Sequence, residues 1–173
     1  WRGSAVTPDK SNTVSVIIDD SREGWVNSLI CLMTAYIDSS RYGKSKFPVF
    51  DYTEIRPKGE PMNGFGGTSS GYEPLKKMHS RIESYLDAFC RGSLTVPPTE
   101  STYWSPATPE VTKPYSHTRL IADIFNAIGA CVVAGNVRRS AEICLGDVND
   151  HDFINLKNYE LNPERSDIGW MSN

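Results

Sequence analysis

The sequence contains no apolar run close to the ~20 residues that a membrane-spanning helix needs. Its first ten residues, WRGSAVTPDK, hold no apolar core of the kind found in secretion signals. Positive charge is not in excess, since 18 basic and 21 acidic residues give a formal net charge of −3. This balance argues against a nucleic-acid partner. We therefore expect a cytoplasmic protein without membrane or nucleic-acid partners.

Cysteine and histidine are scarce and scattered. The four cysteines form no C-x-x-C pair, which argues against a zinc site or a thioredoxin-like motif; they are Cys31, Cys90, Cys131 and Cys144. The three histidines stand in unrelated contexts, at His79, His117 and His151. We predict no self-contained catalytic or metal site, and we expect the cysteines to be buried free thiols.

The residues that are present are typical of a globular domain. Hydrophobic residues make up 39% and charged residues 23% of 173 positions, unlike the composition of disordered chains. The chain begins at Trp1 instead of Met and stops just after the apolar pair Trp170 and Met171. We therefore expect an internal segment of a longer protein.

Patterns of strands and helices alternate along the chain, which predicts an α/β fold. Strands are predicted at residues 14–18, 47–56, 141–145 and 168–171, and helices at 20–37, 74–92, 120–132 and 150–157. Asp20 is the predicted N-cap of the first helix, with Glu23 completing a capping box. The apolar face of that helix is predicted to hold Trp25, Val26, Leu29, Ile30, Met33, Tyr36 and Ile37.

Residues 93–118 interrupt this alternation. The stretch is rich in Ser and Thr and contains five prolines, so neither a helix nor a central strand fits it. We interpret it as an inserted surface loop that contributes no core packing, unless the rings of Tyr103, Trp104 and Tyr115 anchor it against the surface.

Two aspartates, Asp19 and Asp20, stand between the first predicted strand and the first predicted helix. A carboxylate there caps free amide groups and complements the helix dipole. It is also placed to accept a hydrogen bond from a ribose hydroxyl of a ligand. The two roles are compatible, and the sequence leaves both open.

A glycine-rich loop follows the second predicted strand. Arg56 and Lys58 enter it, and five glycines stand between positions 59 and 71, among them Gly66 and Gly67. Guanidinium and ammonium groups together with free backbone amides suit the phosphates of a nucleotide. The alternative is a flexible loop without a ligand, since the spacing matches neither a Walker A motif nor a dinucleotide fingerprint.

The third predicted helix leads into a turn with an unusual concentration of planar polar groups: Gly135, Asn136, Val137, Arg138, Arg139 and Ser140. Guanidinium and amide groups can read base edges or stack on base faces, which lysine cannot do. A solvated turn with surface arginines is the alternative.

Several longer segments of the sequence resemble segments of one enzyme family. They are DSREGWVNSL, FDYTEIRPKGEPMNGFGGTSSGYEPL, DIFNAIGACVVAGNVRRSAEICLGD, DFINLK and WMSN. In order and spacing they resemble the adenosylcobalamin-dependent, class II ribonucleotide reductases, especially the monomeric ribonucleoside-triphosphate reductases. The resemblance extends from about residue 14 to residue 173 and excludes 93–118.

The resemblance implies that this segment is part of a ten-stranded α/β barrel. It places a deoxynucleoside triphosphate effector on Asp20, Ser21, Arg56, Lys58, Gly66 and Gly67. It places the specificity loop, residues 135–140, between effector and substrate base, with Arg138 at the position of the base-contacting arginine. Asn136 departs from the glycine common in class I relatives, so individual contacts cannot be transferred.

For the whole enzyme, the resemblance implies reduction of ribonucleoside triphosphates for deoxyribonucleotide biosynthesis and DNA replication. Adenosylcobalamin would initiate a cysteine thiyl radical, and a thioredoxin-type reductant would supply electrons. None of the four cysteines here stands in a radical or redox motif of the family, so the segment alone is expected to be inactive. Two alternatives stay open: a non-catalytic nucleotide-binding regulatory module, and a structural fragment without a ligand.

Overall fold

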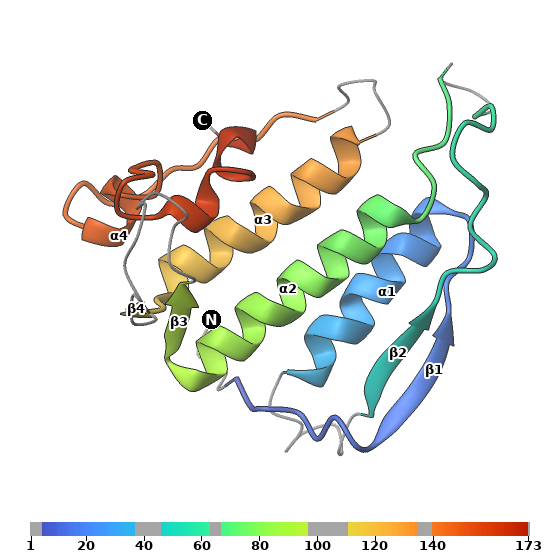
Figure 1. Ribbon diagram of the computed structural model, residues 1–173, viewed down its shortest axis with the longest axis horizontal. Helices are drawn as coiled ribbons and strands as arrows, with labels where there is room; N and C mark the ends of the chain where they lie inside the picture. The colour runs from blue at the N-terminus through green and yellow to red at the C-terminus, as the bar shows by residue number, and fades with distance from the viewer. Residues whose placement is uncertain (1–4, 37–45, 63–66, 97–110, 135–139, 173) are drawn as a thin grey trace, which may run out of the picture.

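Helices form the middle layer of the molecule in the computed structural model, which describes residues 5–36, 46–62, 67–96, 111–134 and 140–172. Three long helices lie side by side, with a strand pair on one side and the C-terminal segment on the other (Figure 1). The helices are α1 (Arg22–Ala35), α2 (Glu73–Arg91), α3 (His117–Val133) and the short α4 (His151–Ile154). The strands are β1 (Thr13–Ile17), β2 (Phe47–Asp51), β3 (Ser93–Val96) and β4 (Val111–Pro114). Two 3-10 helices follow, η2 (Pro163–Arg165) and η3 (Gly169–Met171).

Strands β1 and β2 pair in parallel, from Thr13 opposite Phe47 to Ile17 opposite Asp51. The second strand is five residues shorter than predicted. The side chain of Asp51 accepts a hydrogen bond from the Thr53 amide at 3.0 Å, which turns the chain out of the sheet. Both carboxyl ends therefore stop at the same edge of the sheet.

Helix α1 begins one residue later than predicted, because Ser21 and not Asp20 is its N-cap. The Ser21 hydroxyl oxygen accepts from the Gly24 amide at 2.9 Å. The predicted apolar face is also wrong in part, since Val26 and Ile30 are 55% and 54% exposed. The buried positions are Gly24, Ser28, Leu32 and Ala35, a mostly small set that lets the helix approach its neighbours closely.

Helix α2 matches its prediction well. Pro74 lies in its first turn, and Gly92 ends it in the left-handed conformation, with φ of 73°. The face predicted to be apolar is buried at Leu75, Met78, Ile82 and Leu86. These residues join Leu32 of α1 and Leu120 and Ile124 of α3 in one hydrophobic core.

The prediction that residues 93–118 are irregular and carry no core packing is wrong at both ends of the stretch. Strands β3 and β4 pair antiparallel, from Ser93 opposite Pro114 to Val96 opposite Val111. Tyr115 is 5% exposed and belongs to the core, and Ser116 caps α3. The aromatic residues Tyr103 and Trp104 lie outside the described residues.

The two predicted C-terminal strands are not formed. In residues 141–145 only Glu142 makes a β-bridge, to Ser172, and Gly169–Met171 is a 3-10 helix. The short helix predicted at 150–157 is confirmed as α4, with Asp150 as its N-cap. The chain is thus mixed α/β, and both sheets of the described residues are two-stranded. None of the described helices is long and apolar enough to cross a membrane.

Candidate functional site

Asp20 and Arg56 meet where the two parallel strands end. Asp20 follows β1 and Arg56 follows β2, and the Arg56 Nε donates to the Asp20 carboxylate in an ion pair. Their side chains are 29% and 35% exposed, so both stay accessible to a ligand. The structure thus brings together two residues that the sequence analysis assigned to one site and that lie 36 positions apart.

The N-terminal end of α1 lies at the same strand edge (Figure 1). Its amide groups and helix dipole favour negative charge there. Gly24 packs against the turn before the helix: a Cβ at this position would lie 2.5 Å from the Asp19 carbonyl oxygen. Glycine is therefore what lets α1 start so close to β1. The Ser21 hydroxyl oxygen is engaged in capping, while its proton can still be donated.

The glycine-rich loop is more regular than predicted. The amide of Gly59 donates to the Ser69 carbonyl at 2.9 Å, and the Ser69 amide donates to the Glu60 carbonyl at 2.7 Å. The Met62 amide donates to the Gly67 carbonyl at 3.0 Å, and Gly67 has φ of 120°. These bonds hold the two arms of the loop together as a small hairpin; Gly66 lies outside the described residues.

Lys58 stands on the arm that enters this hairpin, and its side chain is exposed. Opposite it, Gly71 is buried with φ of 75°, and a Cβ there would lie 3.2 Å from the Lys58 amide nitrogen. Glycine is required at this point by both conformation and space. Lys58 is thereby fixed at the base of the hairpin, two residues after Arg56.

A buried histidine connects the elements that surround the site. His79 of α2 is 3% exposed, and its ring is hydrogen-bonded to the Ser28 hydroxyl at 2.9 Å and to the Tyr52 hydroxyl at 2.8 Å. Phe50 stacks on the ring with centroids 4.2 Å apart. Burial lowers the pKa of His79 to about 4. The ring is therefore neutral at physiological pH and links α1, α2 and the end of β2.

The specificity loop predicted at residues 135–140 begins directly after α3. Helix α3 runs opposite to α2, so its C-terminal end lies at the same end of the helix layer as the start of α2 (Figure 1). Ala134 is its C-cap. Gly135, Asn136, Val137, Arg138 and Arg139 lie outside the described residues, and of the predicted loop only Ser140 is placed, half-buried.

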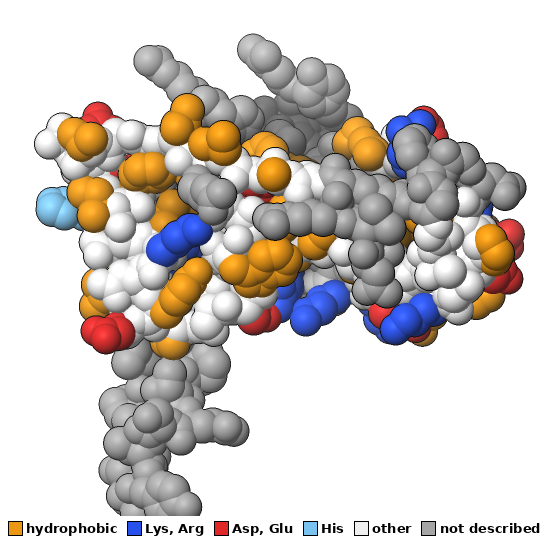
Figure 2. Space-filling view, turned by 90° about the horizontal axis from the view of Figure 1, so that it is seen from above, with side chains coloured by type: hydrophobic (Ala, Val, Ile, Leu, Met, Phe, Trp, Pro, Cys, Tyr) orange, Lys and Arg blue, Asp and Glu red, His pale blue; other side chains and the backbone are white. Residues whose placement is uncertain are grey.

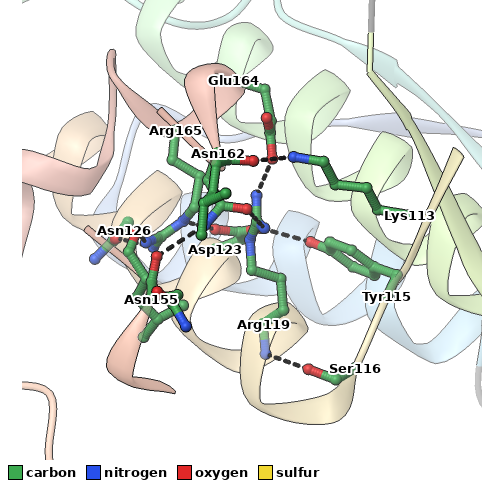
Figure 3. Close-up of polar contacts among 12 residues, drawn as sticks. Lys113, Tyr115, Ser116, Arg119, Asp123, Asn126, Asn155, Asn162, Glu164 and Arg165 are labelled. Atoms are coloured by element: carbon green, nitrogen blue, oxygen red, sulfur yellow. Dashed lines mark hydrogen bonds and ion pairs between the residues drawn. The ribbon is translucent and has the colours of Figure 1, made fainter. Parts of the chain in front are cut away.

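A buried polar network joins α3 to the C-terminal segment (Figure 3). Asp123, which is 1% exposed, accepts from Arg165 Nε at 2.6 Å, from Arg119 Nε at 2.9 Å and from the Tyr115 hydroxyl at 2.8 Å. Burial and the Asp123 carboxylate raise the pKa of Tyr115, so its hydroxyl stays protonated and donates. One carboxylate thus satisfies three donors from three parts of the chain.

The two arginines of this network are fixed by further partners. Arg119 also donates to Asn162 at 2.8 Å and to Glu164 at 2.5 Å. Arg165 also donates to the Leu156 carbonyl and to Asn126 at 2.9 Å. No pattern in the sequence indicates this network, because its members are scattered over about 50 residues without a motif. The network holds the inner side of the C-terminal segment on α3.

The outer side of this segment is different. Large apolar side chains are more than half exposed there: Ile143, Leu145, Val148, Ile154 and Leu161. Figure 2 shows apolar side chains among polar ones at the end of the molecule that carries α4 and the C-terminal segment, with acidic and basic groups interspersed. This face presents no continuous basic surface in the part of the chain that the structure describes.

The four cysteines are free, as predicted, but only Cys131 is buried, and Cys31 is exposed. Burial raises the pKa of the Cys131 thiol to about 12 and also raises that of Cys90, so both are protonated at neutral pH. A protonated thiol is a poor nucleophile. Within the described ranges, His, Cys, Asp and Glu form no group of three or more that could hold a metal ion.

Residues 4–86 match the family model described as the B12-dependent ribonucleotide reductase insertion domain. Over 157 residues the chain is 45% identical to a Dictyostelium discoideum protein named as a probable adenosylcobalamin-dependent ribonucleoside-triphosphate reductase, covering 91% of this chain and 17% of that protein. It is 40% identical to the adenosylcobalamin-dependent ribonucleoside-triphosphate reductase of Euglena gracilis, covering 99% of this chain and 20% of that protein. Adenosylcobalamin, the expected cofactor, is thus named for both relatives.

Among solved structures, the chain is similar to a crystal structure of a B12-dependent, class II ribonucleotide reductase. The TM-score is 0.70 at 28% identity, covering 97% of this chain and 19% of that chain. The chain thus spans about a fifth of the length of these relatives. Asp20, Arg56 and Lys58 lie inside the stretch that matches the insertion domain, and the predicted specificity loop lies outside it.

Proposed function

Because the chain belongs to the family of B12-dependent, class II ribonucleotide reductases, we propose that it binds the deoxynucleoside triphosphate effector of such an enzyme and carries its specificity loop. The observation that carries this proposal is the meeting of Asp20 and Arg56 beside the start of α1. An acceptor for a ribose hydroxyl, a cation for phosphate and a helix N-terminus then lie at one strand edge.

Each candidate residue has a distinct role in this proposal. The Asp20 carboxylate accepts from the ribose, while Arg56 and Lys58 hold the phosphates and Gly66 and Gly67 offer backbone amides. The Asp20 and Arg56 ion pair keeps both side chains in place before the nucleotide arrives, which reduces the entropy lost on binding. His79 and Gly71 fix the surrounding backbone, as described above.

The specificity loop would make the choice of substrate depend on which effector is bound. In this part of the proposal Arg138 contacts a base, and Asn136, Val137, Arg139 and Ser140 shape the loop that presents it. The loop follows α3, whose C-terminal end lies at the same end of the helix layer as the proposed effector site. A shift of the loop on effector binding would then alter which base the substrate site accepts.

For the whole protein, we propose reduction of ribonucleoside triphosphates to 2′-deoxyribonucleotides in the cytoplasm, within a ten-stranded α/β barrel. In the full-length enzyme, adenosylcobalamin bound mainly outside this segment would supply radical chemistry by way of a cysteine thiyl, and a thioredoxin-type reductant would restore the redox cysteines. The residues of this segment bind and discriminate nucleotides and perform no bond cleavage.

Substitutions that each remove one positively charged side chain test the effector site. In the full-length reductase, we expect Arg56→Ala to raise the dissociation constant of deoxynucleoside triphosphates about tenfold or more, since a hydrogen bond to a charged group contributes ~1.5–3 kcal/mol. We expect a smaller rise for Lys58→Ala, because an ammonium group forms no bidentate contact. Equilibrium binding with each of the four deoxynucleotides measures both.

The matched controls are Arg91→Ala and Lys157→Ala, which remove exposed positive charges from the last turn of α2 and from the C-terminal segment. They change net charge as Lys58→Ala does, away from the proposed site. Dissociation constants for the Arg56 and Lys58 variants no different from those of the controls would refute the proposed site.

A further inference from the structure

Glu142 lies two residues beyond the predicted specificity loop, and its side chain is bound to α3. The Glu142 Oε2 atom accepts from the Asn126 side-chain amide at 2.9 Å. Asn126 is 1% exposed, so this hydrogen bond is shielded from water on the helix side. On the backbone, Glu142 forms a β-bridge with Ser172.

The position of the Glu142 side chain against α3 depends on a glycine. A Cβ at Gly129 would lie 2.0 Å from Glu142 Oε1 and 2.6 Å from Met171 Cγ. The carboxylate therefore rests against bare helix backbone, one turn beyond Asn126. No larger residue fits at position 129 while Glu142 keeps this place.

Asn126 is itself held in one orientation. Its Oδ1 accepts from Arg165 Nη2 at 2.9 Å, which leaves its amide nitrogen to donate to Glu142. Arg165 is in turn bound to Asp123 at 2.6 Å. The hydrogen bond to Glu142 is therefore the last in a series that runs from Asp123 through Arg165 and Asn126.

Ala134 and Glu142, which stand on either side of the predicted loop, both lie at α3. Asn126 lies eight residues before Ala134, which is about 12 Å along the helix axis at ~1.5 Å per residue. Both ends of the predicted loop are therefore attached to the same helix, one by continuity and the other by Glu142. The distance between these attachments limits how far the loop can reach.

We propose that Glu142 and Asn126 are positioning residues of the specificity loop, which set its reach toward the nucleotides by anchoring its C-terminal end to α3. This inference rests on the proposed function of the loop. Neither side chain contacts a nucleotide in this proposal. They act through the backbone of residues 135–140, and their loss weakens discrimination among substrates.

The test measures substrate choice in the full-length reductase. With each deoxynucleotide effector in turn, the relative reduction of the four ribonucleotides is determined for Glu142→Ala, Glu142→Gln and the exposed-site control Glu160→Ala. We expect Glu142→Ala to reduce the effector-dependent change in substrate ratio about fivefold, within the usual range of allosteric coupling. Glu142→Gln should retain it, because its amide oxygen can still accept from Asn126.

Effector binding in the absence of substrate separates positioning from general damage. We expect its dissociation constant to stay within about twofold of the wild-type value for Glu142→Ala, since the effector residues lie elsewhere. Gly129→Ala is a second variant, which displaces the carboxylate without removing it and should weaken discrimination in the same way. Unchanged discrimination in both variants, or equal loss in Glu142→Ala and Glu142→Gln, would overturn the proposal.

If the Glu142 and Gly129 variants keep their discrimination, Arg138→Ala shows whether the anchoring role alone or the specificity role of the loop is wrong. We expect it to disturb effector-dependent choice more than basal turnover. If Arg138→Ala abolishes discrimination while the Glu142 and Gly129 variants retain it, the anchoring role alone is wrong. If Arg138→Ala also leaves every effector response unchanged, the loop has no specificity role, and the proposed function fails with it.

Discussion

His79 is the residue on which three elements of the candidate site depend. Its two ring nitrogens bind Ser28 of α1 and Tyr52 beyond β2, while Phe50 covers one face of the ring. A neutral imidazole has one donor and one acceptor, so it can satisfy both hydroxyl groups. Protonation turns both nitrogens into donors and adds a buried charge.

The pKa of His79 predicts a pH dependence. Burial lowers it from its ordinary value of 6.5 to about 4 in the folded protein. Between these values the unfolded chain binds the proton and the folded one does not, so stability is full above pH 6.5 and falls as the pH drops towards 4. We expect a local loss of about 3 kcal/mol over this window, at ~1.4 kcal/mol per unit.

Hydrogen exchange of α2 amides in the full-length protein at pH 7, 6 and 5, corrected for intrinsic rates, measures this loss. His79→Gln is the control, because glutamine can bind both hydroxyl groups and does not titrate in this range. Equal pH slopes for wild type and His79→Gln would show that His79 is not the titrating group.

For single residues, the sequence indicated a role where both the type of side chain and its position in the chain pointed to the same role. The family resemblance implied that Asp20 and Arg56 share an effector site; the two side chains form an ion pair, and the effector site stays a prediction. The N-cap was misassigned because Asp20 and Ser21 are both good caps. The Ile18 amide extends the strand pairing to the Asp51 carbonyl, and the tight turn after it makes Ser21 the cap.

Among the elements, α3 and the C-terminal segment are joined by charge instead of apolar packing alone. Asp123 and Arg165 are each 2% exposed in their side chains, while the ion pairs of Lys10 with Glu83 and Asp87 lie at the surface. Loss of one partner from a buried network leaves charges without compensation. An exposed pair is screened by water and contributes little.

We therefore expect Asp123→Ala to destabilise the contact between α3 and the C-terminal segment by ~3–5 kcal/mol. Lys10→Ala is a matched control, since it also removes two ion pairs, and should cost at most ~1 kcal/mol. Limited proteolysis of the full-length protein, with cleavage rates followed in residues 150–172, compares the two. Equal cleavage rates for both variants would contradict a stabilising role of the network.

Elements with strong local signals were predicted well, and elements made by distant pairing were not. Helix α2 carries its apolar period, Pro74 and Gly92 within its own sequence. Strands β3 and β4 are four residues each and pair across a proline-rich stretch, so no local period indicates them. Residues 168–171 have the composition of a buried strand, but Met171 and Ile168 are buried as a 3-10 turn against α3.

For the molecule as a whole, we expect this segment to bind nucleotides and to perform no catalysis. Burial keeps Cys131 and Cys90 protonated, and none of the four cysteines stands in a motif for radical or redox chemistry. We expect the isolated 173-residue chain to form no deoxyribonucleotide when supplied with adenosylcobalamin, a dithiol and a ribonucleoside triphosphate. Product above the level of a protein-free control would contradict this expectation.

A structure of the full-length enzyme with a deoxynucleoside triphosphate bound shows whether the edge where β1 and β2 end is an effector site. We expect a ribose hydroxyl within about 3.2 Å of the Asp20 carboxylate and phosphate oxygens at hydrogen-bond distance from Arg56 or Lys58. An effector bound elsewhere, with Asp20 and Arg56 still paired only with each other, would show that this strand edge is not the effector site.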